Sequence, residues 1–330
     1  MRHRIVLLVL LVIAAAIYLL NASWLAPAQS GKAVFLAHRG VHQTYHRDNL
    51  KNDTCTATRI DAPAHSYLEN TLPSMDAAFR AGADIVEFDI HPTTDGHFAV
   101  FHDWTLDCRT EGSGVTRHKS LAELKQLDIG YGYTADGGQT FPFRGKGIGL
   151  MPSLDDVLQR FPDRRFLINI KSNDPEEGKQ LATRLARLPD APLKRLMAYG
   201  GDRPISELRA RLPAMVVMSK QSLMACGLRY LALGWSNYVP KSCARSILLV
   251  PANIAPWIWG WPDRLIARME RVGTAVFVIG NMDGTDGTTG IDTPEQFRRL
   301  PQRRNLGIWT NRIEALAPPA AAARERPGLP

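Results

Sequence analysis

The sequence lacks the patterns that mark most nucleic-acid-binding and zinc-binding proteins. It has four cysteines, none in the Cys-x-x-Cys spacing of a zinc site, and it has no aromatic RNA-binding motif and no basic heptad region. The formal net charge is +8, but lysine and arginine are spread along the chain rather than clustered. These absences argue against a nucleic-acid partner, whereas the basic balance is compatible with an acidic small molecule such as a phosphate ester.

Charge is also absent from residues 5–20, an apolar run that follows a basic start at residues 1–4. The run is slightly long for a signal-peptide core, and extending it to Leu25 gives about the 20 residues that span a bilayer. We therefore expect residues 1–31 to be a signal-anchor and linker. An uncleaved anchor is favoured over a cleaved signal, because residues 26–28 make a poor cleavage site. The rest of the chain is expected on the exported side of the membrane, anchored there, or periplasmic or secreted if the signal is cleaved.

The four cysteines fit an exported chain, in which disulfides persist. Cys55 and Cys108 lie in segments that flank residues 84–103, and Cys226 and Cys243 bracket a short loop-rich segment. Four cysteines allow three connectivities. Pairing by neighbourhood predicts Cys55–Cys108 and Cys226–Cys243, with four unrelated thiols as the alternative.

Eight short apolar runs alternate with helical patterns or loops along the chain. The predicted strands are residues 33–38, 84–91, 166–171, 196–199, 214–219, 247–250, 275–279 and 306–310, and the predicted helices are 72–82, 120–127, 153–161, 175–188, 204–212, 221–233, 262–272 and 294–300. This alternation predicts an α/β fold, a TIM (β/α)₈ barrel over residues 32–317. Residues 41–68 form a predicted insertion, and the low-complexity tail 318–330 is expected to be disordered.

The second predicted strand carries several side chains that can take part in catalysis or metal binding. Glu87, Asp89 and His91 alternate with apolar residues and should project from one strand face. Two carboxylates at this spacing lie about 6–7 Å apart and repel by roughly 2–3 kcal/mol at an effective dielectric constant of about 20. Such a face is either an ordinary solvated one or, if it lines a cleft, a site for a divalent cation such as Mg²⁺ or Ca²⁺.

The barrel prediction places further polar residues at the same end of the molecule. Active sites of this fold lie at the carboxyl ends of the strands. The predicted strands end in His38 and Arg39, in Glu87 and Asp89, in Asn169 and Lys171, and in Trp309 and Asn311, while Glu69 and His102 lie on the loops after the first two strands. Singly each has an ordinary structural explanation. Together, paired histidines, carboxylates and cations are suited to phosphoryl chemistry.

The order and spacing of these residues resemble the glycerophosphodiester phosphodiesterase family. The family signature is matched by His38-Arg39-Gly40, Glu69-Asn70-Thr71, Gly82-Ala83-Asp84, Glu87-Phe88-Asp89, Thr94-Asp95-Gly96 and His102-Asp103. The motifs cover residues 33–115, and the strand rhythm extends the resemblance more loosely over the remaining barrel.

This resemblance implies a metal-dependent phosphodiesterase that hydrolyses glycerophosphodiesters to glycerol 3-phosphate and an alcohol. His38 and His102 would be the acid/base pair, with Mg²⁺ or Ca²⁺ as the cofactor. The implied metal site consists of Glu87, Asp89, Asn169 and Glu69, the last also supporting Arg39. Arg39, Lys171 and Trp309 would bind the substrate.

One departure from the family pattern leaves alternatives open. The third strand of the family usually carries Glu-x-Lys, whereas this chain has Asn169-Ile170-Lys171, and the loss of one negative charge should weaken metal binding. A catalytically weakened barrel that only binds phosphodiester head groups is one alternative, and phospholipase D-like activity on intact lipid is another. A barrel glycosidase fits less well, because its paired carboxylates come from different strands.

Overall fold

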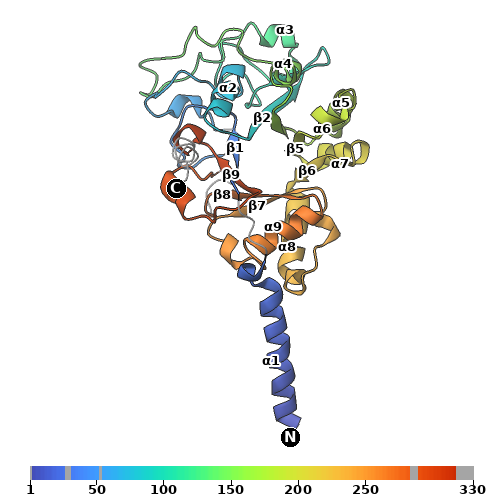
Figure 1. The fold of residues 1–330 in the computed structure, drawn as a ribbon. Coiled ribbons are helices and arrows are strands. Elements are labelled where there is room, and N and C mark those ends of the chain that lie inside the picture. The colour runs from blue at the N-terminus through green and yellow to red at the C-terminus, as the bar shows by residue number, and fades with distance from the viewer. Residues whose placement is uncertain (1, 27–30, 52–53, 283–288, 317–330) are drawn as a thin grey trace, which may run out of the picture.

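The computed structural model describes residues 2–26, 31–51, 54–282 and 289–316. Eight parallel strands pair in the order β6-β5-β4-β2-β1-β9-β8-β7, and no ladder joins β6 to β7 within the described residues. The predicted barrel is therefore confirmed as a nearly closed one (Figure 1). Its strands are β1 (Val34–His38), β2 (Ile85–Pro92), β4 (Arg165–Ile170), β5 (Leu196–Gly200), β6 (Val216–Ser219), β7 (Ile247–Pro251), β8 (Ala275–Ile279) and β9 (Leu306–Thr310).

The helices follow the predicted pattern with shifted ends. They are α2 (Leu72–Arg80), α3 (Leu121–Leu124), α4 (Leu154–Arg160), α5 (Pro175–Leu185), α7 (Asp202–Arg211), α8 (Lys220–Leu233), α9 (Asp263–Arg271) and α10 (Pro294–Arg298). A short helix that was not predicted, α6 (Asp190–Leu193), follows α5. Local chemistry fixes several starts: the Thr71 hydroxyl accepts the Ser74 N–H at 3.2 Å to begin α2, as expected for an N-cap.

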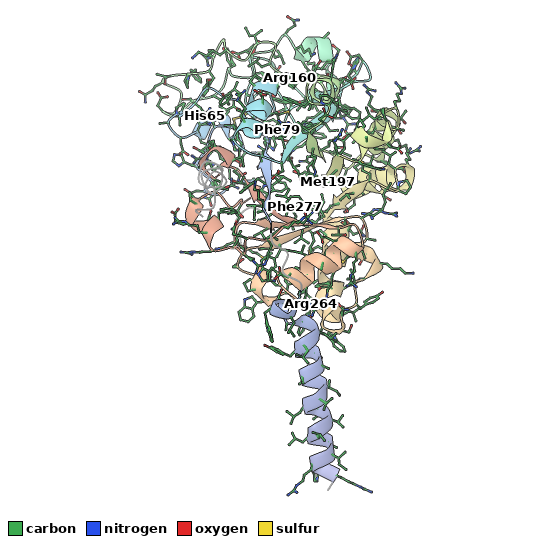
Figure 2. All side chains as sticks on the ribbon, viewed as in Figure 1. His65, Phe79, Arg160, Met197, Arg264 and Phe277 are labelled. Atoms are coloured by element: carbon green, nitrogen blue, oxygen red, sulfur yellow. A yellow bond between two sulfur atoms is a disulfide. The ribbon has the colours of Figure 1, made fainter. Side chains whose placement is uncertain are left out.

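The barrel interior is filled by one side chain from each of the eight strands. These residues are Leu36, Ile85, Leu167, Met197, Met218, Ile247, Phe277 and Trp309. Figure 2 labels Met197 and Phe277, two members of this interior cluster. A second, larger apolar core, which includes Val86 and Phe88, lies between the strands and the surrounding helices. The interior is thus a packed layer, and active sites of this fold lie at its carboxyl end.

The segments that follow β1 and β2 pack on each other to form a third apolar cluster. Its members come from residues 57–68 and 99–151, including Ile60, Phe101 and Met151. A strand that was not predicted, β3 (Phe98–Val100), pairs antiparallel with the end of β2. The described residues of the predicted insertion 41–68 therefore contribute to this packed cluster and include a short 3₁₀ helix, η2 (Ala57–Arg59). The predicted tail 318–330 lies outside the described residues.

Both predicted disulfides are present. Cys55 is bonded to Cys108, which ties the insertion to the segment after β2, and Cys226 is bonded to Cys243 beneath α8. The two bridges close loops with sequence separations of 53 and 17 residues.

The longer loop leads to a stability prediction. Cross-linking residues 53 apart removes chain entropy of the unfolded state worth roughly 4 kcal/mol, against roughly 3 kcal/mol for a separation of 17. We expect a Cys55→Ala/Cys108→Ala variant to lose more stability in urea unfolding than the matched Cys226→Ala/Cys243→Ala variant. Mass spectrometry that finds four free thiols under non-reducing conditions would refute both bridges.

One helix stands apart from the barrel. α1 (Arg2–Asn21) projects from the side of the molecule that carries α8 and α9, and the loops of residues 101–151 lie at the opposite end (Figure 1). Within the described residues it is the one helix that is long and apolar enough to cross a membrane.

Candidate active site

The inner face of β2 carries the acidic residues of the site. Ile85 belongs to the interior layer, so Glu87 and Asp89, two and four residues later, point the same way toward the carboxyl end of the barrel. The register of the sheet places a polar residue of a neighbouring strand beside each carboxylate: Glu87 lies opposite His38 of β1, and Asp89 lies opposite Asn169 of β4. Both carboxylates are completely buried.

A cleft of about 510 Å³ opens above these residues. It is lined by Thr54, Cys55, His102, Asp103, Trp104, Thr105, Cys108 and Lys171. Lys171 Nζ reaches down to Asp89 Oδ1 at 3.6 Å, which connects the cleft to the buried carboxylates. The Cys55–Cys108 bridge forms part of the wall, so the insertion shapes this opening.

The ring of His38 is oriented from behind by an amide. Its Nδ1 lies 2.7 Å from Asn311 Oδ1, and the Asn311 Nδ2 group donates to Asp292 Oδ2 at 2.9 Å, which fixes the amide so that its oxygen faces the histidine. His38 Nδ1 must then carry the proton, and Nε2, 3.7 Å from Glu87 Oε2, has a free lone pair. Burial, followed by the charges of Arg39 and His42, lowers the pKa of His38 well below its usual value. The ring is therefore neutral at pH 7 and can accept a proton.

His102 is held in a similar way by a carboxylate. Its Nδ1 lies 2.6 Å from Asp103 Oδ1, and Arg109 Nε donates to Asp103 Oδ2 at 2.8 Å. Although burial alone would raise the pKa of Asp103, Arg109 and His102 hold it well below its usual range. Burial and the charges of Arg39 and Lys171 lower the pKa of His102. A carboxylate on Nδ1 directs Nε2 to proton exchange and stabilises the imidazolium when it forms.

Cations and acids alternate around Asp89. Arg39 lies 3.2 Å from Glu69 and 3.3 Å from Asp89, and Arg39 itself is buried. Asn70 adds two reciprocal hydrogen bonds to Asp89: its Nδ2 donates to Oδ2 at 3.0 Å, and its Oδ1 accepts the Asp89 N–H at 3.1 Å. Burial alone would raise the pKa of Asp89, but Lys171 and Arg39 lower it strongly, so this carboxylate is ionised.

The two β2 carboxylates suit a divalent cation by their charge. Burial and the neighbouring Asp89 raise the pKa of Glu87 to about 8, which is the behaviour of an acid pair that a cation would neutralise. Asn169 donates its Nδ2 to Asp89 Oδ1 at 2.8 Å, so its amide oxygen is the atom left for a cation. Within the described residues no three His, Cys, Asp or Glu side chains form a metal-binding group. Two carboxylates and one amide oxygen are the atoms that a cation could contact here, and its binding stays a prediction.

Glu69, the fourth predicted metal ligand, faces cations of the protein itself. Its Oε1 lies 3.2 Å from Arg39 and its Oε2 lies 3.3 Å from Arg109. This arrangement favours the other role expected for Glu69, the support of Arg39, and its metal contact stays a prediction.

Trp309 lies beneath the site and presents an unused donor. Its ring packs 5.3 Å from that of His38 and 6.0 Å from that of Tyr199. Its Nε1 is buried and has no hydrogen-bond partner within the described part of the chain. A buried N–H group without a protein acceptor is costly, which fits the predicted role of Trp309 in binding substrate oxygen.

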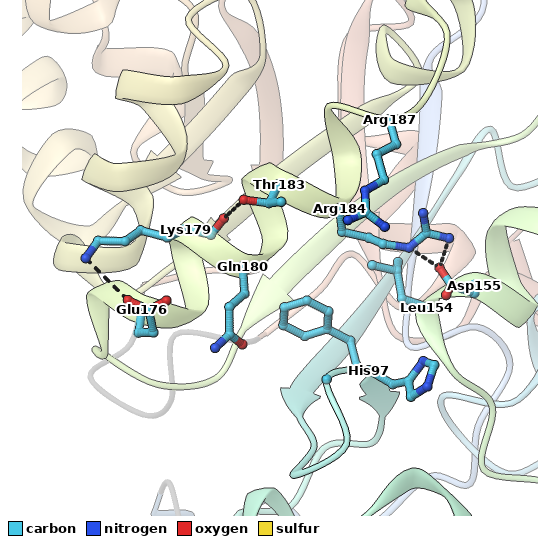
Figure 3. Close-up of a pocket in the computed structure, with 11 residues that line it drawn as sticks. His97, Leu154, Asp155, Glu176, Lys179, Gln180, Thr183, Arg184 and Arg187 are labelled. Atoms are coloured by element: carbon cyan, nitrogen blue, oxygen red, sulfur yellow. Dashed lines mark hydrogen bonds and ion pairs between the residues drawn. The ribbon is translucent and has the colours of Figure 1, made fainter.

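A second pocket, between α4, α5 and the turn before β3, holds none of the predicted site residues (Figure 3). Its charged side chains are partly paired with each other: Arg184 Nε donates to Asp155 Oδ1 at 2.6 Å, and Lys179 Nζ to Glu176 Oε2 at 3.3 Å. The barrel mouth therefore remains the candidate site.

Several residues that complete the site were not predicted from the sequence. Tyr199 donates its hydroxyl to Glu87 Oε1 at 2.7 Å, and buried Arg109 donates to Thr56 Oγ1 at 2.7 Å as well as to Asp103. Tyr199 could have been found, because it ends a predicted strand at the active edge. Arg109 and Asp292 sit in predicted loops, where no local pattern marks them.

Comparison with known proteins agrees with this geometry. Residues 38–189 match the model of the Glycerophosphoryl diester phosphodiesterase family. Over these residues the chain is similar to this family. The match begins at His38 and includes both histidines, the β2 carboxylates and Lys171.

Individual family members cover parts of the chain. A glycerophosphodiester phosphodiesterase of Caldanaerobacter subterraneus is 38% identical over 103 residues, which are 31% of this chain and 39% of the relative. One from Bacillus subtilis is 34% identical over 139 residues, 41% of this chain and 46% of the relative. The chain thus spans less than half the length of these curated relatives.

Solved structures of the family share the fold over most of the chain. A glycerophosphodiester phosphodiesterase from Agrobacterium tumefaciens covers 88% of this chain and 99% of its own, with a TM-score of 0.56 and 21% identity. An Oleispira antarctica phosphodiesterase, solved in complex with the product sn-glycerol-3-phosphate, covers 86% and 94%, with a TM-score of 0.53 and 18% identity. At these identities the likeness concerns the fold.

Proposed function

We propose that this chain is a metal-dependent phosphodiesterase that hydrolyses glycerophosphodiesters to glycerol 3-phosphate and an alcohol. The observation that carries the proposal is the pair of histidines at one barrel mouth, each held through Nδ1 by a fixed acceptor, Asn311 for His38 and Asp103 for His102. The family match supports the same reaction class, and the Oleispira antarctica phosphodiesterase with bound sn-glycerol-3-phosphate supports the product.

Hydrolysis of a phosphodiester requires two proton transfers. Water adds to phosphorus as its proton passes to one imidazole, the bond from phosphorus to the alcohol oxygen breaks, and the other imidazole, protonated, gives that oxygen a proton. Both rings have lowered pKa values in the free protein. An arriving phosphodiester anion favours the imidazolium form, so the acid is formed where the substrate binds.

The remaining polar groups hold the phosphate. Lys171 lines the cleft, and Arg39 and the Trp309 N–H lie behind it, so they supply positive charge and a donor for phosphate oxygens. Glu87, Asp89 and the Asn169 amide oxygen would hold Mg²⁺ or Ca²⁺. When bound, such an ion neutralises charge that develops on the phosphate.

We further propose that α1 is retained as a membrane anchor, with the barrel on the exported side. Twenty residues at about 1.5 Å each make a helix about 30 Å long, which matches the hydrocarbon core of a bilayer. Arg2 and Arg4 at its start favour a cytoplasmic N-terminus. The two disulfides suit an oxidising compartment.

The substrate class can be tested with the full chain in nanodiscs. With Mg²⁺ or Ca²⁺ present, we expect release of glycerol 3-phosphate from a panel of water-soluble glycerophosphodiesters, measured with a coupled glycerol 3-phosphate dehydrogenase assay. Chelation by EDTA should abolish the release, and re-addition of the ion should restore it.

The same preparation should be given intact phospholipid in mixed micelles. Turnover of the lipid with none of the soluble panel would replace the proposal with a phospholipase D-like activity. Binding of the soluble esters by calorimetry, without product from either class, would favour a barrel that binds head groups only.

A further inference from the structure

The end of α1 is fastened to the barrel by side-chain hydrogen bonds. Asn21 Nδ2 donates to the Trp235 carbonyl at 2.8 Å, in the 3₁₀ helix η4 (Gly234–Ser236) that ends α8. In the next turn, η1 (Ser23–Leu25), the Ser23 hydroxyl accepts the Asp263 N–H at 2.7 Å and donates to the Gly260 carbonyl at 3.4 Å. The direction of α1 is thus set by the barrel.

A buried arginine completes this joint. Arg268 of α9 is 1% exposed, and its Nη2 donates to the Leu20 carbonyl at 2.9 Å while its Nη1 donates to Asn21 Oδ1 at 3.0 Å. Its Nε donates to Asn237 Oδ1 at 2.7 Å. A cation at the carboxyl end of a helix is favourable, and removal of α1 would take the Leu20 carbonyl from Nη2 and the Asn21 side chain from Nη1. The joint therefore favours retention of α1 over its cleavage as a signal.

Exposed aromatic side chains gather around the joint. Within the described residues, six tryptophans and tyrosines outside α1 are exposed. Four of them lie close in sequence to the bonded residues of the joint: Trp24 follows Ser23, Trp235 accepts the Asn21 amide, Tyr238 follows Asn237, and Trp257 lies three residues before Gly260. Leu231 and Leu233 at the end of α8 are also exposed. We call the α1-end surface the set of these four aromatic residues and two leucines: Trp24, Leu231, Leu233, Trp235, Tyr238 and Trp257. Trp257 is 83% exposed and Trp24 is 71% exposed, which is unusual for indole rings.

We propose that the α1-end surface lies in the lipid interface, so that the barrel rests on the membrane through α8, η4 and η6 (Ala255–Trp257). This inference rests on the proposed role of α1 as an anchor. Because α1 spans about the thickness of the hydrocarbon core, Asn21 and the surface around it come level with the head groups. Tryptophan and tyrosine are enriched at that depth, where an apolar ring and a polar N–H or O–H are both accommodated.

Seating of the barrel on the α1-end surface would set the orientation of the cleft relative to the membrane. The loops of residues 101–151, which supply His102 and part of the cleft, lie at the end of the molecule opposite α1 (Figure 1). A barrel seated on the α1-end surface therefore turns this side of the site toward water. That orientation agrees with a water-soluble diester better than with a lipid held in the same bilayer.

Single labels on the full chain test this seating. All four native cysteines are in disulfides, so an introduced cysteine is the one free thiol. Variants Trp257→Cys and Trp235→Cys would carry the fluorophore NBD in phosphatidylcholine vesicles, with Ile148→Cys, an exposed apolar position in the distant loops, as the matched control. We expect labels at 257 and 235 to show blue-shifted emission and to lose most of their intensity when the lipid carries a nitroxide near its head group, and the label at 148 to do neither.

Flotation of the same vesicles separates the possible failures. If the chain floats but the label at 257 behaves like that at 148, the anchor stands and the proposed surface is refuted. If the label at 257 is shielded from aqueous iodide yet insensitive to lipid nitroxide, a protein covers the surface, and the proposal is also refuted. A chain that does not float would refute the anchor itself.

Discussion

Replacement of His102 by alanine is expected to lower kcat/KM for a glycerophosphodiester by about 10²–10⁴-fold, the usual contribution of a positioned acid or base. The ring lines the cleft, and its Nδ1 is committed to Asp103, so the loss removes the Nε2 that exchanges a proton. Steady-state kinetics on the soluble substrate measures the effect. His38→Ala should cost a similar factor. The double variant should cost less than the product of the two, because residues that act as a unit are not additive.

The matched control is His97→Ala, which removes an exposed histidine from the same excursion after β2. We expect its kcat/KM and its unfolding midpoint to equal those of the unchanged protein. If His102→Ala retained full activity while remaining folded, the assignment of the acid/base pair would be wrong.

Replacement of Asn169 by glutamate, which adds a third carboxylate to the site, is expected to have a large effect on metal binding. Asn169→Glu places a negative charge beside Asp89, and at constant pH this should tighten Mg²⁺ or Ca²⁺ binding by at least about tenfold, or ~1.4 kcal/mol. The substitution also removes the hydrogen bond from Asn169 to Asp89, and when no ion is bound the new carboxylate repels Asp89. The variant should therefore unfold at lower temperature than the unchanged protein in EDTA, and gain more thermal stability from added ion.

Calorimetric titration measures the affinity for the ion, and thermal melts with and without the ion measure the gain in thermal stability that ion binding produces. Asn173→Glu, which makes the same charge change at an exposed position after β4, should leave both quantities unchanged. Equal metal affinity in Asn169→Glu and the unchanged protein would place the cation elsewhere or rule it out at this site.

The fold could be predicted because its signals are local. Strand periodicity, the Thr71 cap with Pro73 and the alternation on β2 each depend on neighbours in sequence. Once the strands were placed, the rule that carboxyl ends share one edge brought His38, Glu87 and Asn169 together, and the register of the sheet agrees. The cysteine pairing was also confirmed, but for another reason: Cys55 and Cys108 lie 53 residues apart, and four cysteines allow three connectivities.

The supporting contacts could not be predicted, because they join distant segments. His38 depends on Asn311 and Asp292, more than 250 residues away in sequence, and the Arg109 network spans Thr56, Glu69 and Asp103. Similarly, residues 41–68 look polar in sequence, yet Ile60 packs with side chains from 99–151 into a shared cluster. Such packing is fixed by tertiary placement, which local pattern does not encode.

The central claim, that this barrel mouth hydrolyses glycerophosphodiesters through His38 and His102, is tested most directly by phosphorus NMR of one reaction. Glycerophosphocholine is incubated with the full chain and Mg²⁺ or Ca²⁺, in parallel with the His38→Ala/His102→Ala variant. With the unchanged protein we expect the diester signal to be replaced by the monoester signal of glycerol 3-phosphate, and with the variant we expect the diester signal to persist. Equal conversion by the two proteins would contradict the central claim.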